Sequence, residues 1–174
     1  MTEIVKIPEE RVKVLIGEGG KTKMEIEQKC RVELTVDSDG DVEVDGETTQ
    51  EFFAKDVVKA IGRGFPSKPA LRLADGDYNL YIIPLKDFSD SDKAISRMKG
   101  RVIGEHGKIK EDIENATESY LSIYGNTISI ISKIDTLEYA KEAIGMILTG
   151  APHTTVLNYL AKARREIRET RLRS

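Results

Sequence analysis

The feature that most constrains this chain is an internal repeat. When the 174-residue sequence is shifted by 87 positions, residues 16–27 align with residues 103–114, with eight identities in twelve positions. The same shift aligns apolar residues further along, such as Leu34 with Leu121 and Ile61 with Leu148. A chance similarity between two glycine turns would not extend to the flanking helices and strands, so the repeat indicates two copies of one supersecondary unit. We therefore expect two similar domains rather than one.

Both copies show the same order of local patterns, βααββα. A β-branched run opens the first copy, and Pro8 with the two acids that follow it is typical of a first helical turn. Thr48 and Glu51 have the spacing of a capping box in front of an apolar stripe, which predicts a longer helix. The expected strands are 3–7, 32–36, 42–44, 78–85, 120–124 and 127–132, and the expected helices are 8–16, 21–30, 48–61, 92–103, 108–116 and 135–148.

These patterns define an α+β chain of four parts. We expect a first domain over residues 1–66, a connector rich in Pro and Gly over 67–77, a second domain over 78–150 and a basic C-terminal helix within 151–174. In that helix, apolar residues at helical spacing predict an amphipathic segment from Thr154 to about Leu172. Its last dozen residues carry six Lys or Arg and two acids.

Composition excludes several classes of protein. A formal charge of -3 excludes a strongly basic protein that coats nucleic acid. Cys30 is the only cysteine, and His106 and His153 are the only histidines, so we expect neither an intramolecular disulfide nor a Cys/His metal site. No segment approaches the roughly 20 apolar residues of a membrane span, and the N-terminus lacks a signal-peptide apolar core. We expect a cytoplasmic monomer without cofactor or metal.

The repeated Gly-x-x-Gly turns at 17–20 and 104–107 are the strongest candidates for a binding site. Glycine lets the backbone approach a ligand closely, and we expect unpaired amides at the start of the following helix to favour an anion such as phosphate. A nucleotide-hydrolysing P-loop is excluded, because Leu15 replaces the required glycine and Ile109 replaces the metal-binding hydroxyl in the second copy. No constellation of nucleophile, base and orienting group occurs, so we expect no enzymatic activity.

Residues 16–21 and 102–108, each inside the order βααββα, resemble two type I KH domains. This resemblance implies two three-stranded antiparallel-type sheets with helices on one face, and loops that hold single-stranded nucleotides. The segments 21–23, 61–65, 113–117, 150–153 and 159–160 resemble an archaeal ribosome-assembly KH family, related to the eukaryotic small-subunit maturation factor known as partner of Nob. The closer resemblance implies binding to ribosomal RNA near the small-subunit 3′ end, a PIN-domain endonuclease as partner, and the alpha subunit of the archaeal initiator-tRNA-carrying initiation factor as another.

The candidate RNA-binding residues depart from the general KH pattern in charge. Glu18 and Glu105 place an acid near the phosphate, which Lys21 and Lys108 can offset. The second site is better equipped, whereas residues 37–51 hold seven acids and no base and should avoid RNA or face a basic protein. The full set is Ile16, Gly17, Glu18, Gly19, Gly20, Lys21, Lys23, Gly100, Arg101, Ile103, Gly104, Glu105, His106, Gly107, Lys108 and Lys110, with Arg164, Arg165 and Arg168 for the RNA backbone.

The expected function is therefore that of a single-stranded RNA-binding protein in small-subunit ribosome assembly. It would bind ribosomal RNA near its 3′ end and position it for a separate nuclease. Two alternatives stay open at this point: a general KH regulator of mRNA translation or decay, and a protein-docking scaffold whose first glycine loop is vestigial.

Overall fold

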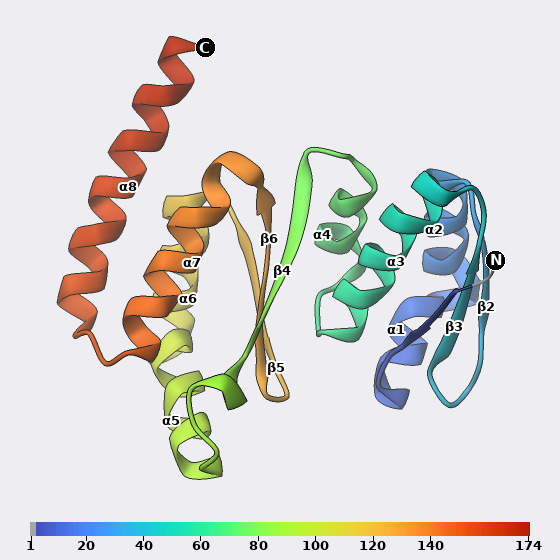
Figure 1. The fold of residues 1–174 in the computed structure, drawn as a ribbon, viewed down its shortest axis with the longest axis horizontal. Coiled ribbons are helices and arrows are strands. Elements are labelled where there is room, and N and C mark those ends of the chain that lie inside the picture. The colour runs from blue at the N-terminus through green and yellow to red at the C-terminus, as the bar shows by residue number, and fades with distance from the viewer. Residues whose placement is uncertain (1–2) are drawn as a thin grey trace. The chain divides into compact units, whose positions relative to one another are not determined.

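The computed structural model describes residues 3–174 and shows two compact units, the first ending at Leu80 and the second beginning at Tyr81 (Figure 1). Each unit contains a three-stranded antiparallel sheet with helices packed on one face, and the strand orders are β1-β3-β2 and β4-β6-β5. The predicted α+β class is confirmed. No helix within residues 3–174 combines the length and apolar character needed to cross a bilayer.

In the first unit, β3 is the central strand of the sheet. Its alternating valines pair with apolar residues of both neighbours, Val42 with Val5 of β1 and Val44 with Leu34 of β2. These side chains are buried beneath the helices, together with Ile26 and Ile61. The elements are β1 (Glu3–Lys6), η1 (Glu9–Arg11), α1 (Val12–Ile16), η2 (Glu18–Gly20), α2 (Lys21–Cys30), β2 (Glu33–Val36), β3 (Asp41–Asp45), α3 (Thr48–Gly62), α4 (Ser67–Leu71) and η3 (Arg72–Ala74).

In the second unit, β6 is central, and Ile130 and Ile128 pair with Leu121 and Ile123 of β5. These residues form one core with apolar residues of α5, α6, α7 and α8. The elements are β4 (Tyr78–Pro84), which begins three residues before the boundary at Tyr81, η4 (Leu85–Asp87), α5 (Asp92–Ile103), η5 (Glu105–Gly107), α6 (Lys108–Thr117), β5 (Tyr120–Tyr124), β6 (Thr127–Lys133), α7 (Ile134–Leu148) and α8 (His153–Arg173).

The structure differs from the sequence-based expectation at two places. The predicted capping box is wrong: Glu47 is the N-cap of α3, and the Glu51 carboxylate accepts a hydrogen bond from the Gly46 amide at 3.1 Å. The predicted connector contains α4 and η3, which both pack against α3. The domain limits at 1–66 and 78–150 stay a prediction.

Candidate nucleic-acid interface

The two glycine loops, residues 17–20 and 104–107, have the same backbone conformation. The first glycine of each lies at φ 76°, and the last lies in the left-handed region, at φ 79° for Gly20 and 74° for Gly107. Each loop joins the helix before it to a ten-residue helix, α2 or α6. The repeat seen in the sequence is therefore also a repeat of backbone geometry.

The first glycine of each loop is required by packing within the unit. A Cβ atom at Gly17 would lie 2.4 Å from Thr22 Oγ1, and one at Gly104 would lie 2.4 Å from Ile109 Cγ1. By contrast, a Cβ atom at Gly20 or Gly107 would meet no heavy atom within 4 Å. The first glycine thus serves the fold, while the last leaves open space at the start of a helix.

The loops differ at their third position, which is Gly19 in the first and His106 in the second. Both residues are left-handed, with φ 62° and 56°. For a residue with a Cβ atom, this conformation costs roughly 1–2 kcal/mol. The His106 side chain is 91% exposed and makes no compensating buried contact, and its Nε2 lies 3.7 Å from Glu105 Oε1. Strain at an exposed position of this kind is typical of a functional site.

The amides at the junction of loop and helix bond within the loop. The Gly20 amide donates to the Gly17 carbonyl at 3.2 Å, and the Lys21 amide donates to the Glu18 carbonyl. The second loop repeats both bonds. The expectation that these particular amides are unpaired is therefore wrong, and the attraction for an anion rests on the positive end of the helix dipole and on the nearby lysines.

Lysines follow each loop directly. Lys21 and Lys108 are both exposed. Lys108 Nζ lies 3.0 Å from Asp112 Oδ1, and hydrogen bonding to this carboxylate raises the pKa of Lys108. Lys108 therefore stays charged at neutral pH and lies beside the open face of Gly107.

A second lysine in each unit belongs to a three-residue bridge that ties the helix to an edge strand. Lys23 Nζ lies 3.8 Å from Glu27, and Glu27 Oε2 accepts a hydrogen bond from the Leu34 amide of β2 at 2.9 Å. The sequence comparison aligned Glu27 with its counterpart, yet this bridging role was missed. The second unit repeats the bridge with the same distances at Lys110, Glu114 and Leu121.

The helix before each loop presents an apolar residue next to it. Ile103 is 37% exposed, and Ile16 is half-buried. Gly100 is exposed, and a Cβ atom there would meet no heavy atom within 4 Å. The second unit thus has a small residue and an accessible apolar side chain beside its loop.

Arg101, which the sequence predicts as an RNA contact, forms hydrogen bonds within the second unit. Its guanidinium donates to the carbonyl of Ile147 at 2.7 Å and to that of Ala151. The Arg101 carbonyl in turn lies 3.0 Å from His153 Nε2. Arg101 therefore ties α5 to the end of α7 and the start of α8, and its guanidinium is engaged within the protein.

The remaining candidates belong to other elements. Arg164, Arg165 and Arg168 are exposed on α8. The acidic stretch 37–51 includes β3, whose Glu43 and Asp45 are exposed.

Cys30 is buried at the end of α2, and burial raises the pKa of its thiol to about 11. Residues 3–174 contain no group of three or more His, Cys, Asp or Glu side chains suited to a metal ion.

Comparison with known proteins gives matches over both units. Residues 2–60 match the KH domain, and residues 79–165 match the eukaryotic type KH-domain (KH-domain type I). The chain is 42% identical to a KH domain-containing protein of Methanocaldococcus jannaschii, over 97% of this chain and 77% of that protein. It is 33% identical to the pre-rRNA-processing protein pno1 of Aspergillus fumigatus, over 66% of this chain and 47% of that protein. The chain belongs to the Dim2p/PNO1-like family of proteins with two KH domains.

A crystal structure of another member of the Dim2p/PNO1-like family has the same fold. In the complex of a/eIF2alpha, aDim2p and rRNA from Pyrococcus horikoshii, a chain with 37% identity superposes with a TM-score of 0.88 over 95% of each chain. The expected pair of KH domains and the relationship to the eukaryotic maturation factor are confirmed. This chain spans less than half the length of the fungal pno1.

Proposed function

We propose that this chain is a single-stranded RNA-binding protein that acts on ribosomal RNA during small-subunit assembly and catalyses no reaction of its own. The observation that carries the proposal is the second glycine loop. There, open space at Gly107 adjoins the start of α6 and the charged Lys108. A phosphate placed there is stabilised by the helix dipole and by the lysine.

The second unit also offers a place for the bases. Ile103 provides an accessible apolar wall next to the loop, and the missing side chain at Gly100 leaves room beside it. KH loops of this kind hold about four nucleotides by their backbone. The proposed contacts in this unit are Gly100, Ile103, Gly104, Glu105, His106, Gly107, Lys108 and Lys110.

The first unit has the same loop geometry but a less favourable charge. Its acidic stretch 37–51 has no base, and the unit up to Leu80 holds 17 acids against 12 Lys and Arg. We therefore propose that its loop is a weaker, auxiliary contact that helps to hold one RNA segment. The residues concerned are Ile16, Gly17, Glu18, Gly19, Gly20, Lys21 and Lys23.

The relatives support the choice of RNA. The archaeal aDim2p crystallised together with rRNA and a/eIF2alpha, and the fungal relative is a pre-rRNA-processing protein. By analogy, we propose binding near the small-subunit 3′ end, in the cytoplasm and as a monomer. The RNA would be positioned for a separate PIN-domain endonuclease, with the alpha subunit of the initiation factor as a further partner.

Crosslinking in cells followed by sequencing of the bound RNA tests this function. We expect crosslinks to concentrate on precursor small-subunit rRNA near its 3′ end, and to disappear in a Gly107→Asp variant. Crosslinks spread over messenger RNAs would instead support a general KH regulator. The absence of RNA crosslinks, with protein partners retained, would support a docking scaffold.

A further inference from the structure

The C-terminal helix α8 divides into faces of different chemistry. Its buried stripe consists of Val156, Leu160, Ala163 and Ile167, and the helix packs against α6 and α7. At 3.6 residues per turn, Arg164 and Arg168 fall on one flank of this stripe and Arg165 on the outer side of the helix. Of the two acids near them in the sequence, Glu166 falls on the opposite flank, and Glu169 falls on the outer side, one turn after Arg165.

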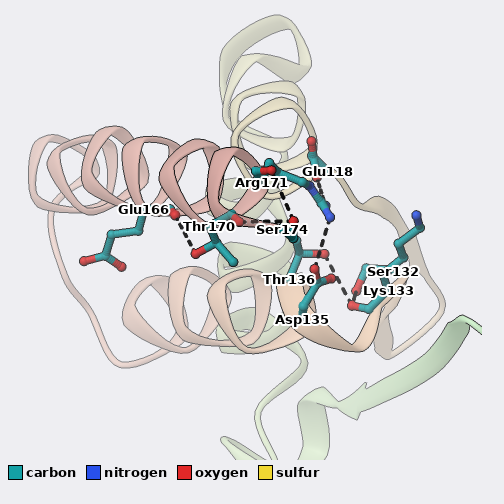
Figure 2. A network of polar contacts seen from close by, with 9 residues as sticks. All are labelled: Glu118, Ser132, Lys133, Asp135, Thr136, Glu166, Thr170, Arg171 and Ser174. Carbon is teal, nitrogen blue, oxygen red and sulfur yellow. Dashed lines mark hydrogen bonds and ion pairs between the residues drawn. The ribbon is translucent and has the colours of Figure 1, made fainter.

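Polar contacts fix the rotation of α8 about its axis. On one flank, Glu166 accepts a hydrogen bond from the Tyr139 hydroxyl of α7 at 2.9 Å. Near the end of the helix, Arg171 lies between Glu118, which follows α6, and Asp135 of α7, with 3.1 Å to Asp135 (Figure 2). Arg171 is therefore engaged within the protein. It lies on the same flank as Arg164 and Arg168, which are themselves exposed.

Arg164, Arg165 and Arg168, here called the arginine stripe, have no such partners. All three are exposed, and within residues 3–174 none of them forms an ion pair. Arg168 lies three and four residues after the other two, a spacing at which like charges destabilise a helix by a few tenths of a kcal/mol per pair. Three neighbouring cations that cost stability and form no ion pair with the protein fit an anionic ligand.

We propose that the arginine stripe is a second RNA-backbone contact, which binds nucleotides beyond those held by the second glycine loop. The inference rests on the proposed function and adds a surface outside the KH loop. The start of α8 lies beside the loop-bearing helix, because His153 contacts the Arg101 carbonyl three residues before Gly104. Arg164 is eleven residues further along, about 16 Å at 1.5 Å per residue.

Two features make phosphate the preferred ligand. Guanidinium groups match phosphate oxygens in a two-pronged geometry and stay charged at all physiological pH values. The apolar face of α8 is already buried against α6 and α7, so the helix has no apolar face left to insert into a lipid surface. An RNA that crosses from the loop to the stripe must be longer than the four nucleotides that the loop holds.

The test compares the wild-type chain with an Arg164→Gln, Arg165→Gln, Arg168→Gln variant over a range of salt concentrations. Two RNAs are used, one of four nucleotides and one of about sixteen, both matching the small-subunit 3′ end. A matched control, Lys162→Gln with Arg173→Gln, removes charges from the opposite flank. Unfolding curves check that each variant folds, and a single Arg168→Gln variant serves if the triple variant does not.

For the longer RNA, we expect the triple variant to lower the slope of log K against log salt by about 2, since each single-strand phosphate contact contributes about 0.7. The ratio of wild-type affinity to triple-variant affinity should therefore fall roughly 20-fold when the salt concentration rises from 50 to 200 mM. The single variant should lower the slope by about 0.7. The four-nucleotide RNA and the control variant should show no comparable change.

Equal slopes and affinities for the wild-type chain and the triple variant on the longer RNA would contradict this inference alone, provided that both still bind. An equal loss on both RNAs would contradict it as well, because a separate contact cannot affect an RNA that does not reach it. Failure of the wild-type chain to bind either RNA would contradict the proposed function and, with it, the inference.

Discussion

The first and second units have the same loop geometry but opposite net charge. The unit up to Leu80 carries 12 Lys and Arg and 17 acids, a net charge of -5, whereas the unit from Tyr81 carries 15 and 13, a net charge of +2. Residues that hold the loop are the same in both, such as the first glycine and the Glu27 and Glu114 bridges to an edge strand. The two units differ at exposed positions such as Glu43 and Asp45, and also at buried ones, such as Val42 and its counterpart Ser129. The first glycine and the helix-to-strand bridge are thus shared by both units, and we propose that surface charge separates the two copies in function.

In both units an arginine binds the carbonyls at the end of a helix, but the two arginines come from different positions of the repeat. The last carbonyls of a helix need partners outside it. In the first unit, Arg11 donates to the carbonyls of Ile61 and Phe65 at the end of α3, at 2.8 Å each. In the second unit, Arg101 does the same at the end of α7. These arginines do not align in the repeat, so the repeat could not predict their shared role.

The largest effect on stability expected from a single substitution concerns the first glycine of each loop. Gly104→Ala places a Cβ atom 2.4 Å from Ile109 Cγ1 in a backbone conformation that only glycine adopts readily. Overpacking and the left-handed φ together should cost roughly 2–5 kcal/mol. Denaturant unfolding should show the same loss for Gly17→Ala. A loss below 1 kcal/mol in either variant would contradict a packing role for the first glycine.

The bridge from helix to edge strand should matter equally in both units. Glu114→Ala removes the acceptor of the Leu121 amide, and Glu27→Ala removes that of the Leu34 amide. Loss of an acceptor for a partly buried amide should destabilise each unit by roughly 1–2 kcal/mol. Glutamine at the same positions keeps an acceptor and serves as the control. Unequal losses measured by thermal unfolding would show that the two bridges do not have the same role in their units.

Exchanging the third loop residues should have opposite effects. His106→Gly removes the backbone strain of a left-handed residue that carries a Cβ atom, and Gly19→His introduces that strain. We expect a gain of about 1 kcal/mol in stability for the first and a loss of about 1 kcal/mol for the second. If His106 contacts RNA, its replacement should also weaken binding despite the gain. Unfolding free energies that change in the same direction would refute the equivalence of the two loops.

The smallest effect concerns Gly100, whose counterpart in the first unit is Lys13. Glycine inside a helix costs roughly 0.5–1 kcal/mol relative to alanine, so Gly100→Ala should stabilise the second unit by about this amount. The added methyl group enters the open space beside the second loop, and RNA affinity should fall a few-fold. Lys13→Ala is the matched control. A gain in stability with unchanged affinity would remove Gly100 from the binding site.

Much of the fold followed from sequence because its signals are local or repeated. The alternation of Val42 and Val44 located β3, and the spacing of Val156, Leu160, Ala163 and Ile167 located the buried face of α8. The capping box at Thr48 was wrong because the Glu51 carboxylate bonds to the Gly46 amide instead. The connector gained a helix because Ala70 and Leu71 are buried against α3.

The site itself was only partly predictable. The glycine loops and their lysines were visible as motifs, since short-range spacing specifies them. The structural role of Arg101 was not, because its acceptors lie 46 and 50 residues away and become neighbours only in the folded unit. The exposed position of the arginine stripe on α8 needed both the helical period and the contacts of Glu166 and Arg171, which fix the rotation of the helix.

The central claim is that RNA is held mainly by the second glycine loop. The most direct test is the affinity of Gly107→Asp and Gly20→Asp for an RNA that matches the small-subunit 3′ end. Both side chains enter open space, but the left-handed φ of each position adds strain of about 1–2 kcal/mol, so unfolding curves must first show that both variants fold. A carboxylate about 4 Å from a phosphate costs up to about 4 kcal/mol at an effective dielectric constant of 20. We predict at least a 100-fold loss for Gly107→Asp and less than about a threefold loss for Gly20→Asp. Wild-type affinity in Gly107→Asp, or an equal loss in both variants, would contradict the account.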